Sequence, residues 1–266
     1  MKERTISAII MLAIFVPIFI IGGTLFEITG FVLALLSLKE FLDIKETKKE
    51  LPIFIKVISY IFIILIMGTN LVENEIAFQM DFRILTAIFM SYLIPTVLYH
   101  DREKFSVNDA FYLIGSILFL AFSFTLLVNV RNISLSLVIY LFSISVITDT
   151  YAYLTGLLVG KHKMIPEVSP KKTWEGAFGG TIAAIFISTV FYITVIDPTA
   201  SVLTLVFVGA FLSVLGQFGD LIFSAIKRYF GKKDFSNLIP GHGGVLDRLD
   251  SIIFVLLGFM FVLNII

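Results

Sequence analysis

The sequence contains no cysteine, a single tryptophan and few charged residues. Of its 266 residues, 15% are charged and 58% are hydrophobic. Without cysteine, disulfides and thiolate metal sites are excluded. Because about 25% of an ordinary soluble domain is charged, the composition predicts a polytopic membrane protein instead. Basic and acidic residues are equal in number, 20 each, so the net charge of zero indicates no nucleic-acid partner.

Apolar runs long enough to cross a bilayer, about 20 residues each, recur along the whole chain. They predict an all-α polytopic membrane protein with about nine transmembrane helices. The expected spans are 5–22, 24–42, 53–72, 83–99, 107–128, 132–158, 174–196, 200–228 and 246–266.

We expect two regions within this bundle. Residues 1–130 supply about five helices that act as a scaffold and as possible homodimer contacts. Residues 131–266 form a catalytic region of about four helices with two long loops, 159–173 and 229–245.

The basic residues predict the orientation. With the N-terminus in the cytoplasm and nine alternating spans, every lysine and arginine except Arg83 and Arg131 falls on the cytoplasmic side. We therefore expect a multi-pass protein of the cytoplasmic (inner) membrane. Both long loops, and a polar cavity beside them, then face the cytoplasm.

Residues 219–251 concentrate charge in an otherwise apolar region. Asp220 lies well inside a predicted span, where a carboxylate without a partner costs about 2.5 kcal/mol or more. Its helical spacing places Ser224, Lys227 and Arg228 on the same face. This polar stripe indicates a cavity, and the alternative is an intramembrane ion pair without chemistry.

Asp247 and Asp250 open the last predicted helix, with Arg248 between them. One carboxylate in a first turn is explained by capping and the helix dipole, but two exceed that need. Asp220 and Asp247 both lie near cytoplasmic helix ends, so we expect them to converge on one divalent cation. Oxygen ligands without cysteine favour Mg²⁺.

Glycines surround His242 in the segment just before that helix. Gly241, Gly243 and Gly244 allow close approach of the backbone to a ligand, and N–H groups that lead into a helix N-terminus bind phosphate. A simple chain turn is the alternative. His242 is either a phosphate hydrogen-bond donor or a structural residue of the loop.

A second polar segment, residues 169–176, precedes the seventh span. Lys171 and Lys172 are candidate phosphate contacts, Thr173 is a candidate N-cap, and Trp174 suits an interface anchor or a stacking partner. Basic residues attracted to anionic headgroups are the alternative. Asp149 lies either deep in the bilayer or on a projecting helix, where it needs a cation or hydroxyl partner.

A hard-metal site beside many phosphate-binding bases predicts phosphoryl or nucleotidyl transfer to a lipid. Residues 224–228, 233–234 and 238–250 resemble the signature of the phosphatidate cytidylyltransferase (CDP-diacylglycerol synthase) family. Residues 149–153 and 169–176 resemble further motifs of that family. The resemblance implies that CTP and phosphatidic acid give CDP-diacylglycerol and pyrophosphate in phospholipid biosynthesis, with Mg²⁺ required.

The resemblance also implies residue roles. Asp220 and Asp247 hold the metal, and Asp149, Asp234 and Asp250 orient neighbouring groups or help to hold a second cation. The expected phosphate clamps are Lys171, Lys172, Lys227, Arg228 and Arg248, and the expected phosphate contacts are Ser224 and His242. The remaining substrate-binding candidates are Ser169, Thr173, Trp174, Gly243 and Gly244.

Two other functions remain open at this point. A CTP-dependent polyprenol or phytol kinase would transfer a γ-phosphoryl group to an alcohol. An ion-coupled transporter would use Asp149 and Asp220 as intramembrane sites, although the charges gather at one membrane face and do not cross it.

Overall fold

A computed structural model describes residues 2–71, 81–99, 104–263 and 265. Position 72 of the third predicted span and positions 264 and 266 of the last lie outside the described residues. Arg102, which belongs to the expected cytoplasmic set, also lies outside them, as do the side chains of Lys2 and Arg4.

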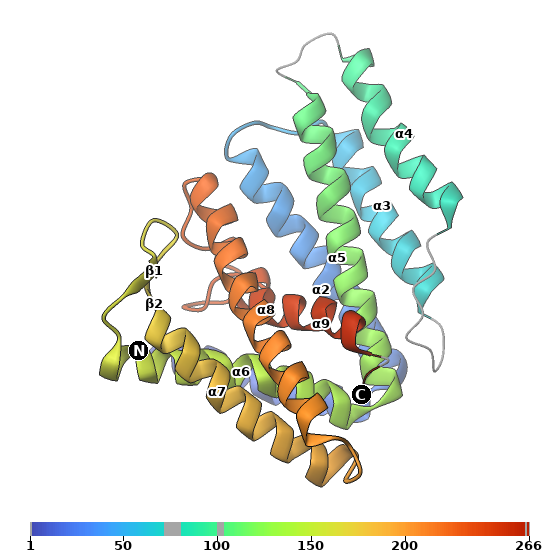
Figure 1. The fold of residues 1–266 in the computed structure, drawn as a ribbon. Helices are drawn as coiled ribbons and strands as arrows, with labels where there is room; N and C mark the ends of the chain where they lie inside the picture. Colours follow the sequence, from blue (N-terminus) through green and yellow to red (C-terminus); the bar gives the residue numbers. More distant parts are fainter. Residues whose placement is uncertain (1, 72–80, 100–103, 264, 266) are drawn as a thin grey trace. The chain divides into compact units, whose positions relative to one another are not determined.

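Within the described residues, the chain forms nine α-helices, one π-helical turn and one two-stranded hairpin (Figure 1). The elements are α1 (Lys2–Ile21), α2 (Gly23–Glu46), α3 (Ile53–Asn70), α4 (Phe82–Leu98), α5 (Val107–Ile133), α6 (Leu135–Val159), β1 (Lys163–Ile165), β2 (Ser169–Thr173), α7 (Trp174–Phe191), η1 (Tyr192–Ile196), α8 (Val202–Tyr229) and α9 (Leu246–Val262).

The predicted all-α membrane class is confirmed. Among the described residues, five helices are long and apolar enough to cross a membrane: α3, α5, α6, α7 with η1, and α8. The apolar part of α1, Thr5–Ile21, and the apolar helix α4 are shorter. Each predicted span coincides with a helix to within about five residues, but that all nine cross a membrane stays a prediction. The hairpin β1–β2 inside loop 159–173 was not predicted.

The chain divides into two compact units. The first comprises residues 1–133 and 234–247. In it, α5 packs against α2, α3 and α4, which stand beside it in Figure 1. Asp109 near the start of α5 is 2% exposed, and Nζ of Lys49 lies 2.7 Å from one of its oxygens. Lys45 contacts the other oxygen, so this buried carboxylate ties α5 to the end of α2.

The turn between α1 and α2 depends on Gly22 and Gly23, whose φ angles are 68° and 56°. Such left-handed backbone favours glycine. Arg131 of α5 donates hydrogen bonds to the carbonyl oxygens of Phe19 and Ile20. The last turn of α1 leaves its carbonyls without helical partners, and the guanidinium group satisfies two of them.

The second unit comprises residues 134–233 and 248–266. Its helices α6, α7 and α8 pack against one another, with α6 and α7 side by side in Figure 1. A Cβ atom on Gly176 or Gly180 would lie 2.5 Å from the carbonyl oxygen of Ala152 or Thr148, respectively. Glycine at both positions therefore permits a close approach of α7 to α6.

Candidate active site

The hairpin β1–β2 places the predicted lysines directly before α7. Its strands pair antiparallel, with Lys163 opposite Thr173. Oγ1 of Thr173 accepts the N–H of Gly176 at 3.2 Å, so the predicted N-cap is confirmed. At the base of the hairpin, the carboxylate of Glu175 accepts the backbone N–H groups of Lys161 and His162. The hairpin that carries the lysines is thus fixed at its base.

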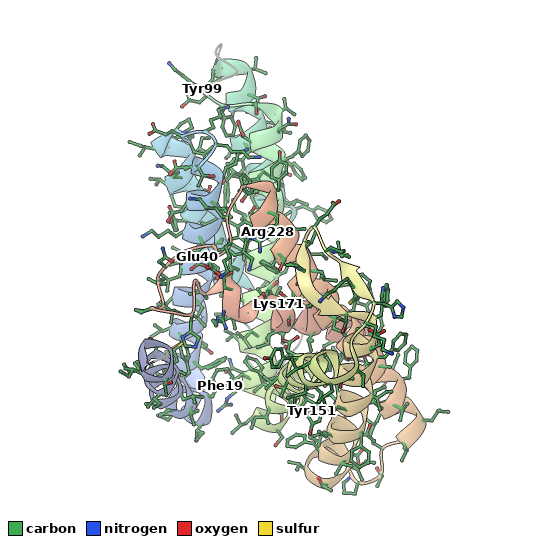
Figure 2. All side chains as sticks on the ribbon, turned by 90° about the vertical axis from the view of Figure 1, so that its left-hand side faces the viewer. Phe19, Glu40, Tyr99, Tyr151, Lys171 and Arg228 are labelled. Atoms are coloured by element: carbon green, nitrogen blue, oxygen red, sulfur yellow. The ribbon has the colours of Figure 1, made fainter. Side chains whose placement is uncertain are left out.

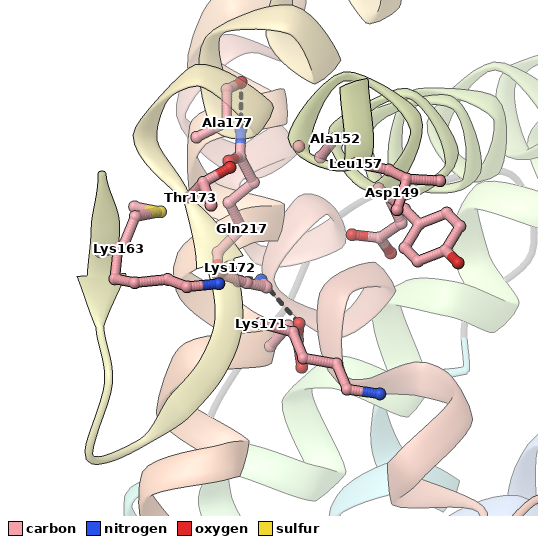
Figure 3. A pocket seen from close by; sticks show the side chains of 13 residues that line it. Asp149, Ala152, Leu157, Lys163, Lys171, Lys172, Thr173, Ala177 and Gln217 are labelled. Atoms are coloured by element: carbon pink, nitrogen blue, oxygen red, sulfur yellow. Dashed lines mark hydrogen bonds and ion pairs between the residues drawn. The ribbon is translucent and has the colours of Figure 1, made fainter. Parts of the chain in front are cut away.

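A cavity of about 500 Å³ opens beside this hairpin in the second unit. Five charged side chains line it, and Figure 3 shows the side chains of those it labels gathered around the same space. They are Asp149, Lys163, Lys171, Lys172 and Asp220. The structure therefore brings together three segments that the sequence marked separately: the region of Asp149, the loop before α7 and the charged end of α8.

Lys172 forms an ion pair with Asp220 across this cavity. Its Nζ lies 2.6 Å from Oδ2 of Asp220, and the two side chains are 21% and 29% exposed. The same Nζ lies 3.5 Å from the carbonyl oxygen of Gln217. Asp220 therefore has the partner that an intramembrane carboxylate needs, and the pair is open to a ligand in the cavity.

Three carboxylates interact electrostatically in this unit. Asp250 is repelled by Asp220 and Asp149 and attracted by Lys227, while Asp149 is attracted by Lys172. The ammonium groups of Lys172 and Lys227 partly offset this repulsion. A bound cation would relieve the remaining repulsion, because an added positive charge favours the ionised form of each acid.

The polar residues of α8 do not all face the same way at the end of the helix. Oγ of Ser224 donates to Oδ1 of Asp220 at 3.4 Å, and Lys227 is buried. Arg228 is exposed and donates to the carbonyl oxygen of Lys232 at 2.9 Å, where the chain leaves the helix. Lys227 therefore turns inward, whereas Arg228 stabilises the C-terminal turn of α8.

The glycine loop belongs to the first unit. Oδ2 of Asp247 accepts the N–H groups of Phe235 at 2.8 Å and Gly244 at 2.9 Å, so this carboxylate holds the loop that leads into α9. The N–H groups of His242 and Gly243 donate to the carbonyl oxygen of Ile239. Because these amides already have acceptors within the protein, phosphate binding by Gly243 and Gly244 stays a prediction.

The remaining candidates are more dispersed. Nδ1 of His242 is buried without a hydrogen-bond partner in the described part of the chain. Asp234 and Arg248 are exposed, and Ser169 is half-buried where β2 begins. Trp174 is 51% exposed and lines a second, apolar cavity beside α7 and α8. The roles predicted for these residues stay predictions.

Metal binding by Asp220, Asp247 and Asp250 also stays a prediction. Asp220 and Asp250 belong to the second unit and Asp247 to the first. Across the described ranges, three or more His, Cys, Asp or Glu side chains are nowhere grouped as ready-made metal ligands. Mg²⁺ commonly binds through one or two carboxylates together with substrate phosphates and water, and such a site needs no preformed cluster.

Comparison with known proteins decides the family. The family model described as "Cytidylyltransferase family" matches residues 2–266. This chain belongs to the cytidylyltransferase family. It is 37% identical to the phosphatidate cytidylyltransferase of Staphylococcus haemolyticus over 96% of both chains. The protein of the same name from Staphylococcus epidermidis is 38% identical, again over 96% of both chains.

The cytidylyltransferase cavity contains residues that the sequence reasoning missed. Lys163 lines it from β1, and Gln217 lines it from α8, one turn before Asp220. Nε2 of Gln217 donates to Oγ1 of Thr181 at 2.9 Å. An amide inside an apolar span, three residues before a carboxylate, is the signal that would have identified Gln217. Lys163 resembles any loop lysine, and only the hairpin reveals its position.

Proposed function

We propose that this protein transfers the cytidylyl group of CTP to phosphatidic acid, giving CDP-diacylglycerol and pyrophosphate. The observation that carries the proposal is the identity of 37–38% over 96% of the chain with relatives named phosphatidate cytidylyltransferase. The enzyme class is a nucleotidyltransferase, and the substrates are CTP and a membrane lipid.

The charged cavity supports this reaction. A phosphate oxygen of phosphatidic acid attacks the α-phosphorus of CTP, a new P–O bond forms, and the bond to the departing pyrophosphate breaks. The attacking oxygen is already anionic, so the protein has to bring two anions together in line. Lys163, Lys171 and Lys172 around one cavity supply the positive charge for that task.

Mg²⁺ is the proposed cofactor, and the donors fit it. Asp220 and Asp250 offer hard oxygen ligands and lie close enough to repel each other. Asp247 is the third proposed ligand. When bound, the ion neutralises charge on the phosphates and on the developing transition state. We also propose that a second cation binds to this group of acids.

An apolar cavity of about 260 Å³ adjoins the charged one and shares Met164, Ala177 and Gln217 with it. Phe178 and Phe218 contribute apolar surface and are 66% and 52% exposed. We assign an acyl chain of phosphatidic acid to this cavity, since a lipid whose phosphate enters the charged cavity has its chains within reach of the apolar one.

The proposed topology has nine spans, a cytoplasmic N-terminus and an active site at the cytoplasmic face of the inner membrane. It is supported by the basic residues, of which Arg83 and Arg131 are the two on the opposite side. A reporter fused to the C-terminus tests it and should be found outside the cytoplasm. We also propose that the protein forms a homodimer through residues 1–130.

The function is tested by incubating the purified protein with CTP, Mg²⁺ and phosphatidic acid and identifying the products. CDP-diacylglycerol with pyrophosphate supports the proposal. CDP with a phosphorylated polyprenol or phytol, when those alcohols are supplied, would favour the kinase. Ion-driven uptake into proteoliposomes without CTP turnover would favour the transporter.

A further inference from the structure

Glu40 near the end of α2 is a buried acid that the reaction described above does not use. It is 2% exposed, and Figure 2 shows it on α2 beside the loop of residues 234–247. Burial of a carboxylate is unfavourable unless hydrogen bonds or opposite charges compensate for it. In the described part of the chain, no lysine or arginine forms an ion pair with Glu40.

The compensating hydrogen bonds all come from one distant segment. Oε1 of Glu40 accepts the hydroxyl of Ser236 at 2.7 Å and the N–H of Val245 at 2.8 Å. Oε2 accepts the N–H of Leu246 at 2.9 Å. Leu246 is the first residue of α9. The carboxylate therefore binds first-turn amides that have no helical acceptor, at the end of the helix where negative charge is favoured.

The fit between Glu40 and the loop is close. A Cβ atom on Gly244 would lie 2.3 Å from Oε1 of Glu40. The N–H of Gly244 in turn donates to Asp247, whereas those of Val245 and Leu246 donate to Glu40. Two carboxylates thus hold three consecutive amides, and the path of the loop depends on both.

We propose that Glu40 is a positioning residue for cytidylyl transfer, acting through residues 236–246. The inference rests on the proposed function, because the loop carries His242 and leads into Asp247, both candidates for the reaction. A small displacement of groups that align reacting phosphates lowers the rate of the chemical step more than it weakens substrate binding.

The test compares Glu40→Gln with wild type and with Ser37→Ala, in full-length protein purified in detergent. Ser37 lies one turn earlier on α2, is fully buried, and its hydroxyl has no hydrogen-bond partner within the described residues. Glu40→Gln keeps the shape of the side chain, but it places an amide N–H group where the backbone N–H groups need an acceptor. We expect kcat to fall at least about tenfold while the KM for CTP stays within about threefold, and Ser37→Ala to match wild type.

Hydrogen exchange gives a readout that does not depend on activity. In Glu40→Gln, the amides of residues 236–246 should exchange faster, while those of α5 keep the wild-type rate. Ser236→Ala removes one of the three hydrogen bonds and should produce a smaller change of the same kind. If Glu40→Gln fails to fold, Ser236→Ala provides the same test in its place.

A double-mutant cycle tests the contact itself. Gly244→Ala should lower kcat when Glu40 is present, because the added methyl group collides with the carboxylate. In Glu40→Ala the space is open, so the double variant should be no less active than Glu40→Ala alone. If the loss of kcat in the double variant instead equals the product of the two single losses, the two residues act independently and the proposal is overturned.

The possible failures are distinguishable. A wild-type protein that forms no CDP-diacylglycerol refutes the proposed function and the positioning role with it. An active wild type with Glu40→Gln unchanged in kcat refutes the positioning role alone. A loss of activity in Glu40→Gln that merely equals its loss of folded protein, judged by gel filtration and thermal unfolding, also refutes it.

Discussion

Nζ of Lys172 lies 2.6 Å from Oδ2 of Asp220, which joins the strand before α7 to the charged end of α8. Both side chains remain partly exposed in the cavity. An ion pair needed only for stability is usually most effective when it is shielded from water. An open pair between a motif lysine and the acid proposed to hold the metal is better suited to exchange its partners for the phosphates and cation of a bound substrate.

Replacing Lys172 with Met should therefore impair the reaction more than the fold. We expect kcat/KM for CTP to fall about 100-fold, the effect of removing one preorganised charge contact to a transition state, with thermal unfolding in detergent shifted by only a few degrees. Steady-state kinetics with labelled CTP measures this. A variant within threefold of wild type would remove Lys172 from the phosphate site.

Removal of the metal should abolish turnover, and Mg²⁺ should restore it. Asp220→Asn is expected to lower kcat by at least about 100-fold, and Asp250→Asn to raise the Mg²⁺ concentration for half-maximal activity about tenfold. Asp197→Asn is the matched control, because Asp197 is a half-buried loop residue that accepts hydrogen bonds from Thr199. An unchanged Mg²⁺ titration in both site variants would contradict the metal assignment.

The apolar cavity should determine the affinity for long acyl chains. Val214 lines the apolar cavity and not the charged one, so Val214→Phe fills part of the space assigned to the lipid. We expect a KM for long-chain phosphatidic acid raised about tenfold, in line with the 1–3 kcal/mol typical of overpacking, and a nearly unchanged KM for CTP. Phe186→Leu, at an exposed position further along α7, is the control. Equal effects on both substrates would argue against an acyl site.

Asp109 should matter for stability alone. Its carboxylate is paired with Lys45 and Lys49, so Asp109→Ala removes one buried negative charge that neutralises two ammonium groups. We expect a loss of about 3 kcal/mol in the free energy of unfolding and an unchanged KM for CTP in the folded fraction. Glu50→Ala, which removes an exposed acid nearby, should be neutral. A normal thermal transition in Asp109→Ala would contradict the importance of this cluster.

Hydropathy and local signals predicted the helices and their ends well. The N-cap Thr173 and the start of α9, with Asp247 in its first turn, follow from residue types that act on their immediate neighbours. The hairpin β1–β2 was missed because its strands are short and polar, with no alternation of apolar residues. These properties left the position of Lys163 unpredicted.

Long-range contacts could not be derived in the same way. The pairing of Lys172 with Asp220 depends on α6, α7 and α8 packing closely, which glycines such as Gly180 permit but do not specify. Glu40 stands in a run of charged residues that ends a helix, and one of its partners is 206 residues further along. Nothing in its local pattern distinguishes it from a solvated glutamate.

The most direct test of the account follows a radioactive label from CTP into lipid. Wild-type protein with Mg²⁺ and phosphatidic acid should transfer the label of α-³²P-CTP into a CDP-lipid and release the label of γ-³²P-CTP as pyrophosphate. Asp220→Ala should do neither. Label from the γ position appearing in lipid, or lipid labelling by α-³²P-CTP that persists in Asp220→Ala, would contradict the account.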